Sequence, residues 1–321
     1  MIILGLSGAL GHDASAAILI DGHIIAAAEE ERFIRDKHAK NKFPYEAAKF
    51  CLKQAGIKAE DVDIVAFPYA EIPLSSNARW HYAKRHWYAP DRALDAIFNG
   101  NRRYRRNRNK SLKLMADLGL SKAKFVSVEH HLAHASSAYH LSGFTEKTAI
   151  IGIDGKGEYA TTFFGYGEHG KIHKIKEFYD PDSLGGLYGA MTEFLGFDML
   201  DGEFKVMGMA PFGDASKYDF SRLAKFEDGE LTINTDYVNV VGLRRYKEAG
   251  KDGKSKGYYF TQKLIDWLGP KRKGDEIDDP YIHYAASIQK LLEELALQMI
   301  DYYLGDIIKE TGRSPWQVVL R

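Results

Sequence analysis

The chain has little of what would anchor it in an oxidising or a lipid environment. It contains one cysteine, Cys51, among 321 residues, so it cannot form an internal disulfide and we expect a cytoplasmic location. Long apolar runs are also missing, because Asp21, His23 and Glu29 interrupt the most hydrophobic stretches. We therefore expect no membrane-spanning segment, and the short apolar start at residues 1–6, which lacks a basic flank, predicts no targeting segment.

Charge is balanced over the chain but unevenly placed along it. The 44 Lys and Arg residues equal the 44 Asp and Glu residues, yet residues 79–113 contain eleven Lys and Arg residues against Asp91 and Asp95, a local excess of nine. Cations interleaved with aromatic rings are typical of a nucleic-acid groove. The alternative is a solvated face of an inserted helical subdomain. Because charge runs are more often solvated, we expect neither a nucleic-acid nor a membrane partner.

A repeated order of short elements indicates how the chain is divided. Apolar strands at residues 2–7, 16–20 and 23–28 are joined by a polar turn and by an Asp21-Gly22 turn, which is a strong hairpin signal. The same order of strand, acidic glycine-containing turn, strand, tight turn and strand recurs at residues 148–178. The alternative to a true repeat is chance similarity between two hairpins.

This repeat predicts two related α/β halves whose first turns can bind phosphate through backbone N–H groups. We expect the first half at residues 1–145, with a basic helical insertion at about 75–115, and the second at residues 146–321. Apolar spacing predicts helices at residues 45–55, 185–197 and 283–308.

Three histidines within five residues, His130, His131 and His134, are unusual in a chain with 12. On a helix, His130 and His134 lie one turn apart on nearly the same face, where two imidazoles can hold one divalent ion. Asp154, at the end of a predicted strand, can add an oxygen ligand. His131 lies about 100° around the helix and should not share the ion. An exposed or otherwise satisfied histidine pair is the alternative.

Five segments resemble the nodulation-type O-carbamoyltransferase family, whose members carbamoylate hydroxyl groups of antibiotics and lipo-oligosaccharides. Their order and spacing fit that family from residue 1 to the last predicted helix, although none is specific alone. The segments are Gly11 to Ala17, Glu30 to Phe33 with Lys37 and His38, His130 to Ala135, Asp154 to Glu158, and Glu203 to Pro211.

The resemblance implies a duplicated actin-like ATPase fold of the ribonuclease H-like kind, similar to proteins that make threonylcarbamoyl-adenosine. It implies an ATP-dependent O-carbamoyltransferase that moves a carbamoyl group from carbamoyl phosphate, through carbamoyl-adenylate, to an acceptor hydroxyl on a small molecule. The implied cofactors are ATP with Mg²⁺ and a divalent metal, Fe²⁺ or Zn²⁺, held by His130, His134 and Asp154. The alternatives are a non-catalytic half that binds metal or phosphate, and an RNA-modifying threonylcarbamoyl-type relative.

The residues expected at the site fall into three groups. A solvated charge cluster, turn-capping side chains or a core histidine would account for many of them equally well. The expected catalytic residues are His131, Lys37 and His12. The expected substrate-binding residues are Asp13, Ser15, Arg32 and His38. The expected nucleotide-binding residues are Gly155, Gly157, Glu203, Lys205 and Gly208.

The sequence departs from the family pattern near residue 321. Members of the family continue with a Gly-Gly-x-x-x-Asn nucleotide loop, a further metal-binding Asp and a separate C-terminal domain, whereas Val318 to Arg321 resembles the strand before that loop. We therefore expect an incomplete second half, a C-terminal partner segment that completes it, and weak ATP binding by this polypeptide alone.

Overall fold

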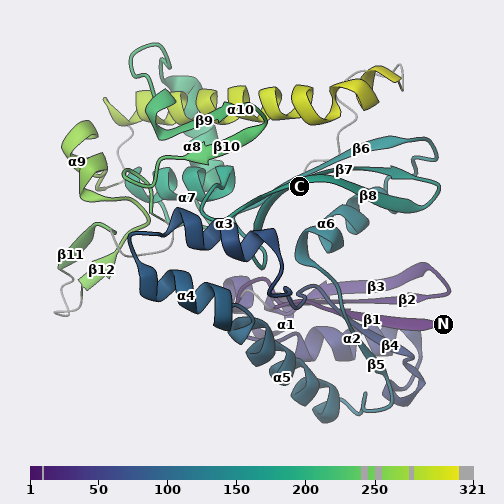
Figure 1. The fold of residues 1–321 in the computed structure, drawn as a ribbon. Helices are drawn as coiled ribbons and strands as arrows, with labels where there is room; N and C mark the ends of the chain where they lie inside the picture. The colour runs from purple at the N-terminus through teal and green to yellow at the C-terminus, as the bar shows by residue number, and fades with distance from the viewer. Residues whose placement is uncertain (9–10, 240–244, 250–254, 275–277, 311–321) are drawn as a thin grey trace. The chain divides into compact units, whose positions relative to one another are not determined.

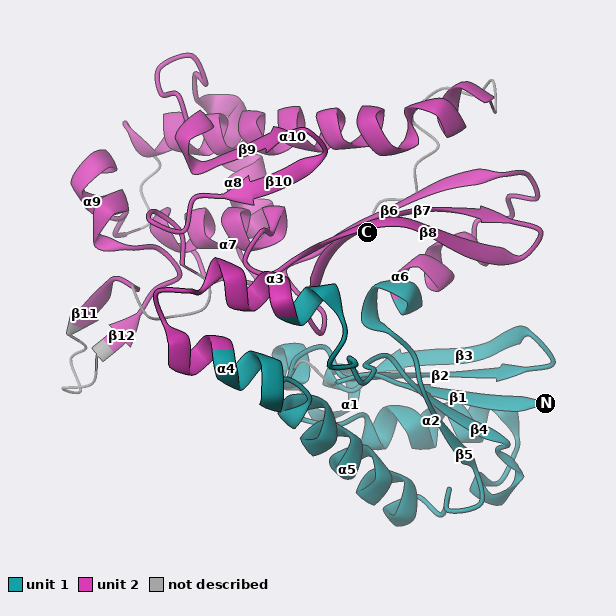
Figure 2. Ribbon diagram, viewed as in Figure 1, with its two compact units in different colours: residues 1–79, 94–133 teal, residues 80–93, 134–321 magenta. Residues whose placement is uncertain are grey.

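The computed structural model describes residues 1–8, 11–239, 245–249, 255–274 and 278–310. The predicted strand at residues 318–321 lies outside the described residues. The chain forms two compact units (Figure 2): unit 1 contains Met1–Arg79 and Leu94–Ala133, and unit 2 contains Trp80–Ala93 and His134–Arg321. The predicted division into halves at residue 145 remains a prediction.

Unit 1 is built on a five-stranded mixed sheet with the order β3-β2-β1-β4-β5 (Figure 1). The first three strands are antiparallel neighbours, whereas β4 and β5 run parallel to β1. This arrangement is that of a ribonuclease H-like half, so the predicted α/β class is confirmed. The strands are β1 (Ile2–Leu6), β2 (Ser15–Ile20), β3 (His23–Glu29), β4 (Ile64–Phe67) and β5 (Lys124–Ser127).

Helix α2 (Tyr45–Ala55) packs small side chains onto this sheet. Ala47, Ala48 and Cys51 are fully buried against Leu4 and Ile18 of the strands. Small residues allow close approach of helix and sheet, and Cys51 is a buried packing residue, as its solitary occurrence suggests. The other helices of this part of the chain are α1 (Glu31–Ile34), η1 (Lys37–Ala39), η2 (Ala59–Asp61), α4 (Pro90–Asn99), α5 (Arg102–Asp117) and α6 (His130–Tyr139).

Unit 2 contains a three-stranded antiparallel meander of β6 (Thr148–Ile153), β7 (Ala160–Glu168) and β8 (Lys171–Tyr179). Its tight turn between β7 and β8 is His169-Gly170. His169 and Gly170 have φ of 48° and 72°, and Asp21 and Gly22 have 49° and 85°, as two-residue hairpin turns require. Each unit thus contains the predicted strand, turn, strand, turn, strand order, while the duplication itself remains a prediction.

The main core of unit 2 lies among this meander, α7 (Leu184–Phe194) and the long helix α10 (Tyr281–Glu310). Phe164, Phe178, Phe194 and Ile288 are buried in it. The remaining elements are α3 (Asn77–Arg85), α8 (Glu203–Met209), η3 (Ala210–Phe212), η4 (Ser221–Leu223), β9 (Ala224–Glu227), β10 (Glu230–Ile233), β11 (Lys247–Ala249), β12 (Ser255–Gly257) and α9 (Gln262–Leu268). Across the described part of the chain, every helix is too short or too polar to cross a bilayer.

A buried glutamate from another segment caps the N-terminus of α2. The N-cap residue, Pro44, has no side chain that can accept a hydrogen bond. Glu30, only 3% exposed, accepts hydrogen bonds from the backbone N–H groups of Glu46 (3.1 Å) and Ala47 (2.8 Å) instead. Its carboxylate also complements the positive end of the helix dipole.

We expect Glu30→Ala to lower the free energy of unfolding by about 1–2 kcal/mol, because it removes the acceptor of one buried and one partly buried N–H group at the start of α2. Urea unfolding followed by circular dichroism measures the loss. The control is Glu29→Ala, whose half-exposed side chain pairs with Arg32 and should cost less than about 0.5 kcal/mol. Equal losses for the two variants would contradict the capping role of Glu30.

Candidate active site

In unit 1, one carboxylate holds two histidines near the first turn. Asp13 has φ of 51°, and its backbone N–H donates to the carbonyl of His38 (2.8 Å). Its Oδ2 lies 2.7 Å from Nδ1 of His12, and its Oδ1 lies 2.9 Å from Nδ1 of His38. Partial burial alone would raise the pKa of the Asp13 carboxyl, but the hydrogen bonds with His12 and His38 outweigh burial and lower it.

Three of the predicted site residues, His12, Asp13 and His38, are thus in contact. Other predicted site residues lie in the neighbouring segments of the chain. Lys37 is exposed and precedes His38 in η1. The backbone N–H of His38 donates to Oε2 of Glu31 (2.8 Å). Ser15 begins β2 directly after the turn. Arg32, whose side chain is 71% exposed, pairs with carboxylates of its own segment, Glu29 and Glu31, and its contact with substrate remains a prediction.

The predicted metal ligands lie close together. His134 Nε2 is 3.9 Å from Asp154 Oδ2, a separation that two ligands can have when each is about 2.1 Å from one ion. His130 is one turn earlier on helix α6. Each of the three residues offers one ligand atom, and among the described residues these atoms lie within 4.8 Å of one another.

Hydrogen bonds of two of these residues orient them for coordination. His130 Nδ1 lies 3.3 Å from the carbonyl of Pro68; because a carbonyl only accepts, Nδ1 carries the proton and Nε2 keeps its lone pair. Asp154 follows β6, and its Oδ1 accepts from the N–H of Gly155 (2.6 Å), so Oδ2 points toward His134. Such second contacts fix the orientation of metal ligands. A set of two imidazoles and one carboxylate fits Zn²⁺ or Fe²⁺.

His131 is oriented differently from its neighbours. Its ring is 1% exposed and packs edge-on against His130, with centroids 5.5 Å apart. It is not part of the cluster of possible metal ligands in the described residues. This agrees with the 100° helical offset predicted from the sequence, while its catalytic role remains a prediction.

The loop that carries Asp154 rests on the N-terminus of α7. Ser183, the N-cap of that helix, accepts from the N–H of Gly186 and lies within hydrogen-bonding distance of the carbonyls of Asp154 (3.1 Å) and Gly155 (2.8 Å). A Cβ at Gly185 would lie 2.6 Å from the Asp154 carbonyl oxygen. Only glycine permits this contact, so helix and loop keep a fixed distance.

The five predicted nucleotide-binding residues are placed on two segments of unit 2. Gly157 closes the Asp154 loop by donating to the carbonyl of Ala160 (2.8 Å). Glu203 accepts from the N–H groups of Leu200 and Gly202 at the start of α8. Lys205 lies over aromatic rings, and Gly208 is exposed, with open space where a Cβ would be. The N–H groups of Gly155 and Gly157 and the Glu203 carboxylate thus have partners within their own segments, and the contacts of all five residues with nucleotide remain predictions.

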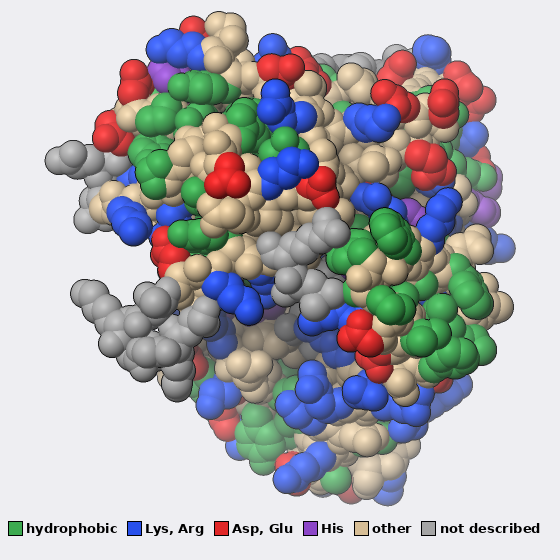
Figure 3. Space-filling view, turned by 60° about the vertical axis from the view of Figure 1, so that its left-hand side comes forward, with side chains coloured by type: hydrophobic (Ala, Val, Ile, Leu, Met, Phe, Trp, Pro, Cys, Tyr) green, Lys and Arg blue, Asp and Glu red, His purple; other side chains and the backbone are tan. Residues whose placement is uncertain are grey.

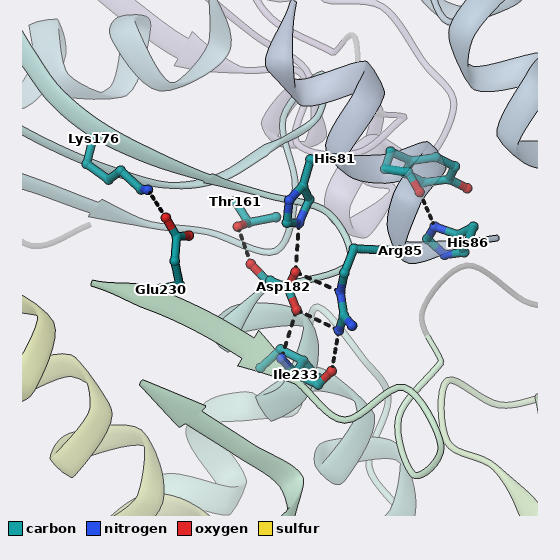
Figure 4. Close-up of polar contacts among 9 residues, drawn as sticks. His81, Arg85, His86, Thr161, Lys176, Asp182, Glu230 and Ile233 are labelled. Atoms are coloured by element: carbon teal, nitrogen blue, oxygen red, sulfur yellow. Dashed lines mark hydrogen bonds and ion pairs between the residues drawn. The ribbon is translucent and has the colours of Figure 1, made fainter. Parts of the chain in front are cut away.

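Sequence reasoning missed a buried carboxylate that connects distant segments (Figure 4). Asp182, 2% exposed, accepts from Nε (3.0 Å) and Nη2 (2.9 Å) of Arg85, lies 2.7 Å from Nε2 of His81, and accepts from the N–H of Ile233 (2.8 Å). Its carbonyl accepts from the buried hydroxyl of Thr161 (2.7 Å). Arg85 and His81 belong to the basic aromatic stretch, so part of that stretch is structural. No local pattern marks a pair 97 residues apart.

The same part of unit 2 contains a second pair of this kind. Lys156, within the Asp154 loop, forms a hydrogen bond and ion pair with the buried Asp180. Its ammonium group lies 5.5 Å from the ring centre of Tyr82 and 5.7 Å from that of Tyr159. The loop is therefore held through its lysine as well as through Ser183.

Strand order and donor set together define an α/β protein with a ribonuclease H-like sheet and a His-His-Asp cluster. Residues 2–313 match the family described as Carbamoyltransferase N-terminus. The chain belongs to this family.

Two curated relatives are similar to most of the chain. The chain is 34% identical over 312 residues to the uncharacterized protein sll1178 of Synechocystis, covering 92% of this chain and 47% of that protein. It is 31% identical over 323 residues to the nodulation protein NolNO of Sinorhizobium fredii, covering 94% and 42%. The chain therefore spans about half the length of the curated relatives it matches.

Among solved structures, YeaZ from Pseudomonas aeruginosa is similar with a TM-score of 0.29 and 15% identity, covering 56% of this chain and 68% of that one. A likeness this low supports no argument about the site, and the fold is established by the strand order itself.

We expect Asp182→Ala to lower the free energy of unfolding by about 3 kcal/mol, because it removes the partner of a charged group and of a buried N–H. The matched control is Glu230→Ala, which breaks the more exposed ion pair with Lys176 seen in the same view and should cost less than about 1 kcal/mol. Chemical unfolding measures both. Similar values for the two would show that the Asp182 network contributes no more than a surface pair.

Proposed function

We propose that this chain provides the catalytic N-terminal part of an ATP-dependent O-carbamoyltransferase. The observation that carries the proposal is the match to the carbamoyltransferase family over residues 2–313. In the proposed reaction, water cleaves carbamoyl phosphate to carbamate and phosphate. Carbamate then displaces pyrophosphate from ATP, which gives carbamoyl-adenylate, and an acceptor hydroxyl displaces AMP to form the carbamoylated product. The proposed acceptor is a hydroxyl-bearing small molecule.

In this proposal the metal ligands are His130 Nε2, His134 Nε2 and Asp154 Oδ2. A divalent ion bound there would supply Lewis-acid stabilisation of negative charge on phosphate or carbonyl oxygens. The chain's own contribution is orientation. Pro68 fixes the tautomer of His130, and the N–H of Gly155 fixes the carboxylate of Asp154. We infer modest affinity, because three protein ligands leave the rest of the shell to water.

We assign binding of the carbamoyl phosphate dianion to the group of His12, Lys37 and His38. Lys37 supplies a permanent positive charge, whereas Asp13 fixes the rings of His12 and His38 through their Nδ1 atoms. With Nδ1 held in this way, Nε2 of His12 is the ring nitrogen that can exchange a proton with substrate oxygen, whereas Nε2 of His38 is buried. ATP, with Mg²⁺, is assigned to Gly155, Gly157, Glu203, Lys205 and Gly208.

Metal binding tests the first assignment. Protein washed with chelator and reloaded with Zn²⁺ or Fe²⁺ should retain about one equivalent, and His130→Ala, His134→Ala or Asp154→Ala should each lower retention at least about tenfold. Elemental analysis after gel filtration measures this. His140→Ala, which removes an exposed histidine just beyond the same helix, is the matched control. Unchanged metal content in the first three variants would reject the site.

Anion binding tests the second assignment. Calorimetric titration with carbamoyl phosphate should show Lys37→Ala binding about tenfold more weakly than the parent, since a charge-assisted hydrogen bond is worth about 1.5–3 kcal/mol. Lys40→Ala removes an equally exposed lysine from the same loop and should leave the affinity unchanged. If Lys40→Ala and Lys37→Ala weaken binding alike, a general electrostatic effect replaces the specific contact.

A further inference from the structure

Helix α5 (Arg102–Asp117) presents a dense row of positive charge to solvent. Seven of its residues between 102 and 113 are exposed cations, and the first acidic residue of the helix is Asp117 at its end. Figure 3 shows Lys and Arg side chains gathered at the lower end of the view, where α5 lies. The exposed cations are Arg102, Arg103, Arg105, Arg106, Arg108, Lys110 and Lys113.

The opposite side of α5 is fixed in unit 1. Tyr104, Asn107, Ser111, Leu114 and Met115 are buried there, and the Tyr104 hydroxyl hydrogen-bonds with Ser127 Oγ (2.9 Å). The cations therefore lie on a helix that is already ordered. Binding of a ligand would not have to order this part of the backbone. The burial of Tyr104 also removes the one aromatic ring that the sequence places among these cations.

This row of charge is costly to the isolated protein. Like charges three or four residues apart on a helix, such as Arg106 with Lys110, destabilise it by about 0.2–0.5 kcal/mol per pair. Arg102 is partly compensated, because its guanidinium group lies 3.5 Å from the carboxylate of Asp95. Cations in the first turn also oppose the helix dipole, and that turn contains no acidic residue. Neutral polar residues would solvate the same face without this cost. The excess is local, since the chain as a whole has no net charge.

The kind of cation on the exposed face of α5 favours some anionic partners over others. Five of the seven cations are arginines, whose planar guanidinium groups bind phosphate oxygens in pairs. The row extends over about 17 Å of helix, and a nucleic-acid duplex offers about ten phosphates over that length. An interfacial membrane helix needs an exposed apolar face, whereas the apolar side of α5 is buried in the protein.

We propose that the exposed face of α5 binds the phosphate backbone of a nucleic-acid duplex without reading its sequence. The proposed contacts are to phosphate oxygens, which carry no sequence information, and the described part of this face has no exposed aromatic ring on which unpaired bases could stack. This inference is independent of carbamoyl transfer and of the metal ligands.

The test is the salt dependence of binding to a fluorescent 20-base-pair duplex, measured by anisotropy with double-stranded RNA and with double-stranded DNA. Neutralising two exposed arginines with Arg105→Gln and Arg106→Gln should lower the slope of log K against log salt by about 2. Arg105→Lys with Arg106→Lys should keep the slope, because each lysine still displaces a counterion. Thermal unfolding of each variant checks that the helix remains folded.

The matched control removes two exposed charges elsewhere in unit 1, Lys53→Gln and Lys58→Gln, and should leave the slope unchanged. An equal loss in this control would overturn the proposal, because binding would then follow total charge. A second result would also overturn the proposal: binding to phosphatidylserine vesicles together with failure to bind either duplex. That result would show that the face binds a membrane surface. The exposed Leu94 and Phe98 of the preceding helix α4 would then contribute apolar contacts.

Discussion

The structure around the Asp154 loop depends on the hydrogen bonds and the ion pair of the Asp182 carboxylate. The carboxylate is buried, and its partners are a guanidinium group and an imidazole, both from α3, and a backbone N–H from β10. A buried charge without partners would cost several kcal/mol, so these segments must reach it together or not at all. The next residue, Ser183, caps α7 and contacts the loop that contains Asp154. The same short stretch of chain therefore ties helix α3 to the loop that supplies a candidate ligand.

In both candidate sites, the Asp13 group and the metal ligands, an oxygen atom fixes the orientation of a histidine ring by a hydrogen bond to Nδ1. In unit 1, Asp13 fixes two histidines through their Nδ1 atoms and is itself held ionised by them. On α6, the carbonyl of Pro68 fixes His130 through the corresponding atom. In each case an oxygen acceptor on one ring nitrogen determines what the other nitrogen can do, which is how a protein sets the chemistry of an imidazole.

The basic aromatic stretch shows how one sequence feature divides among different roles. His81 and Arg85 bind the buried Asp182, so these two side chains hold segments of unit 2 together. Tyr104 is an anchor of α5, whereas the arginines around it are exposed. The sequence shows an excess of cations but not which of them are neutralised, since Arg85 pairs with Asp182 at a distance of 97 residues along the chain. The sequence alone did not favour a nucleic-acid partner. The exposed cations of α5 in the folded chain support one.

Local rules were sufficient for much of the fold. Alternation of apolar residues and the Asp21-Gly22 turn predict the hairpin of β2 and β3, since side-chain period and left-handed turn residues are properties of a few neighbours. The helical pair His130 and His134 follows from 3.6 residues per turn in the same way. Strand order, however, is a matter of long-range pairing, and the parallel placement of β4 and β5 beside β1 is found only in the folded chain.

What the sequence by itself determined is therefore the class of fold, the hairpins, the positions of α2, α7 and α10, and the two-histidine motif with its candidate carboxylate. What only the tertiary structure decided is which charges are buried. Glu30 caps a helix 16 residues away in the chain, and Asp182 binds Arg85 across 97 residues. The physical reason is that burial makes a charge depend on every segment packed around it, whereas periodicity depends only on its neighbours.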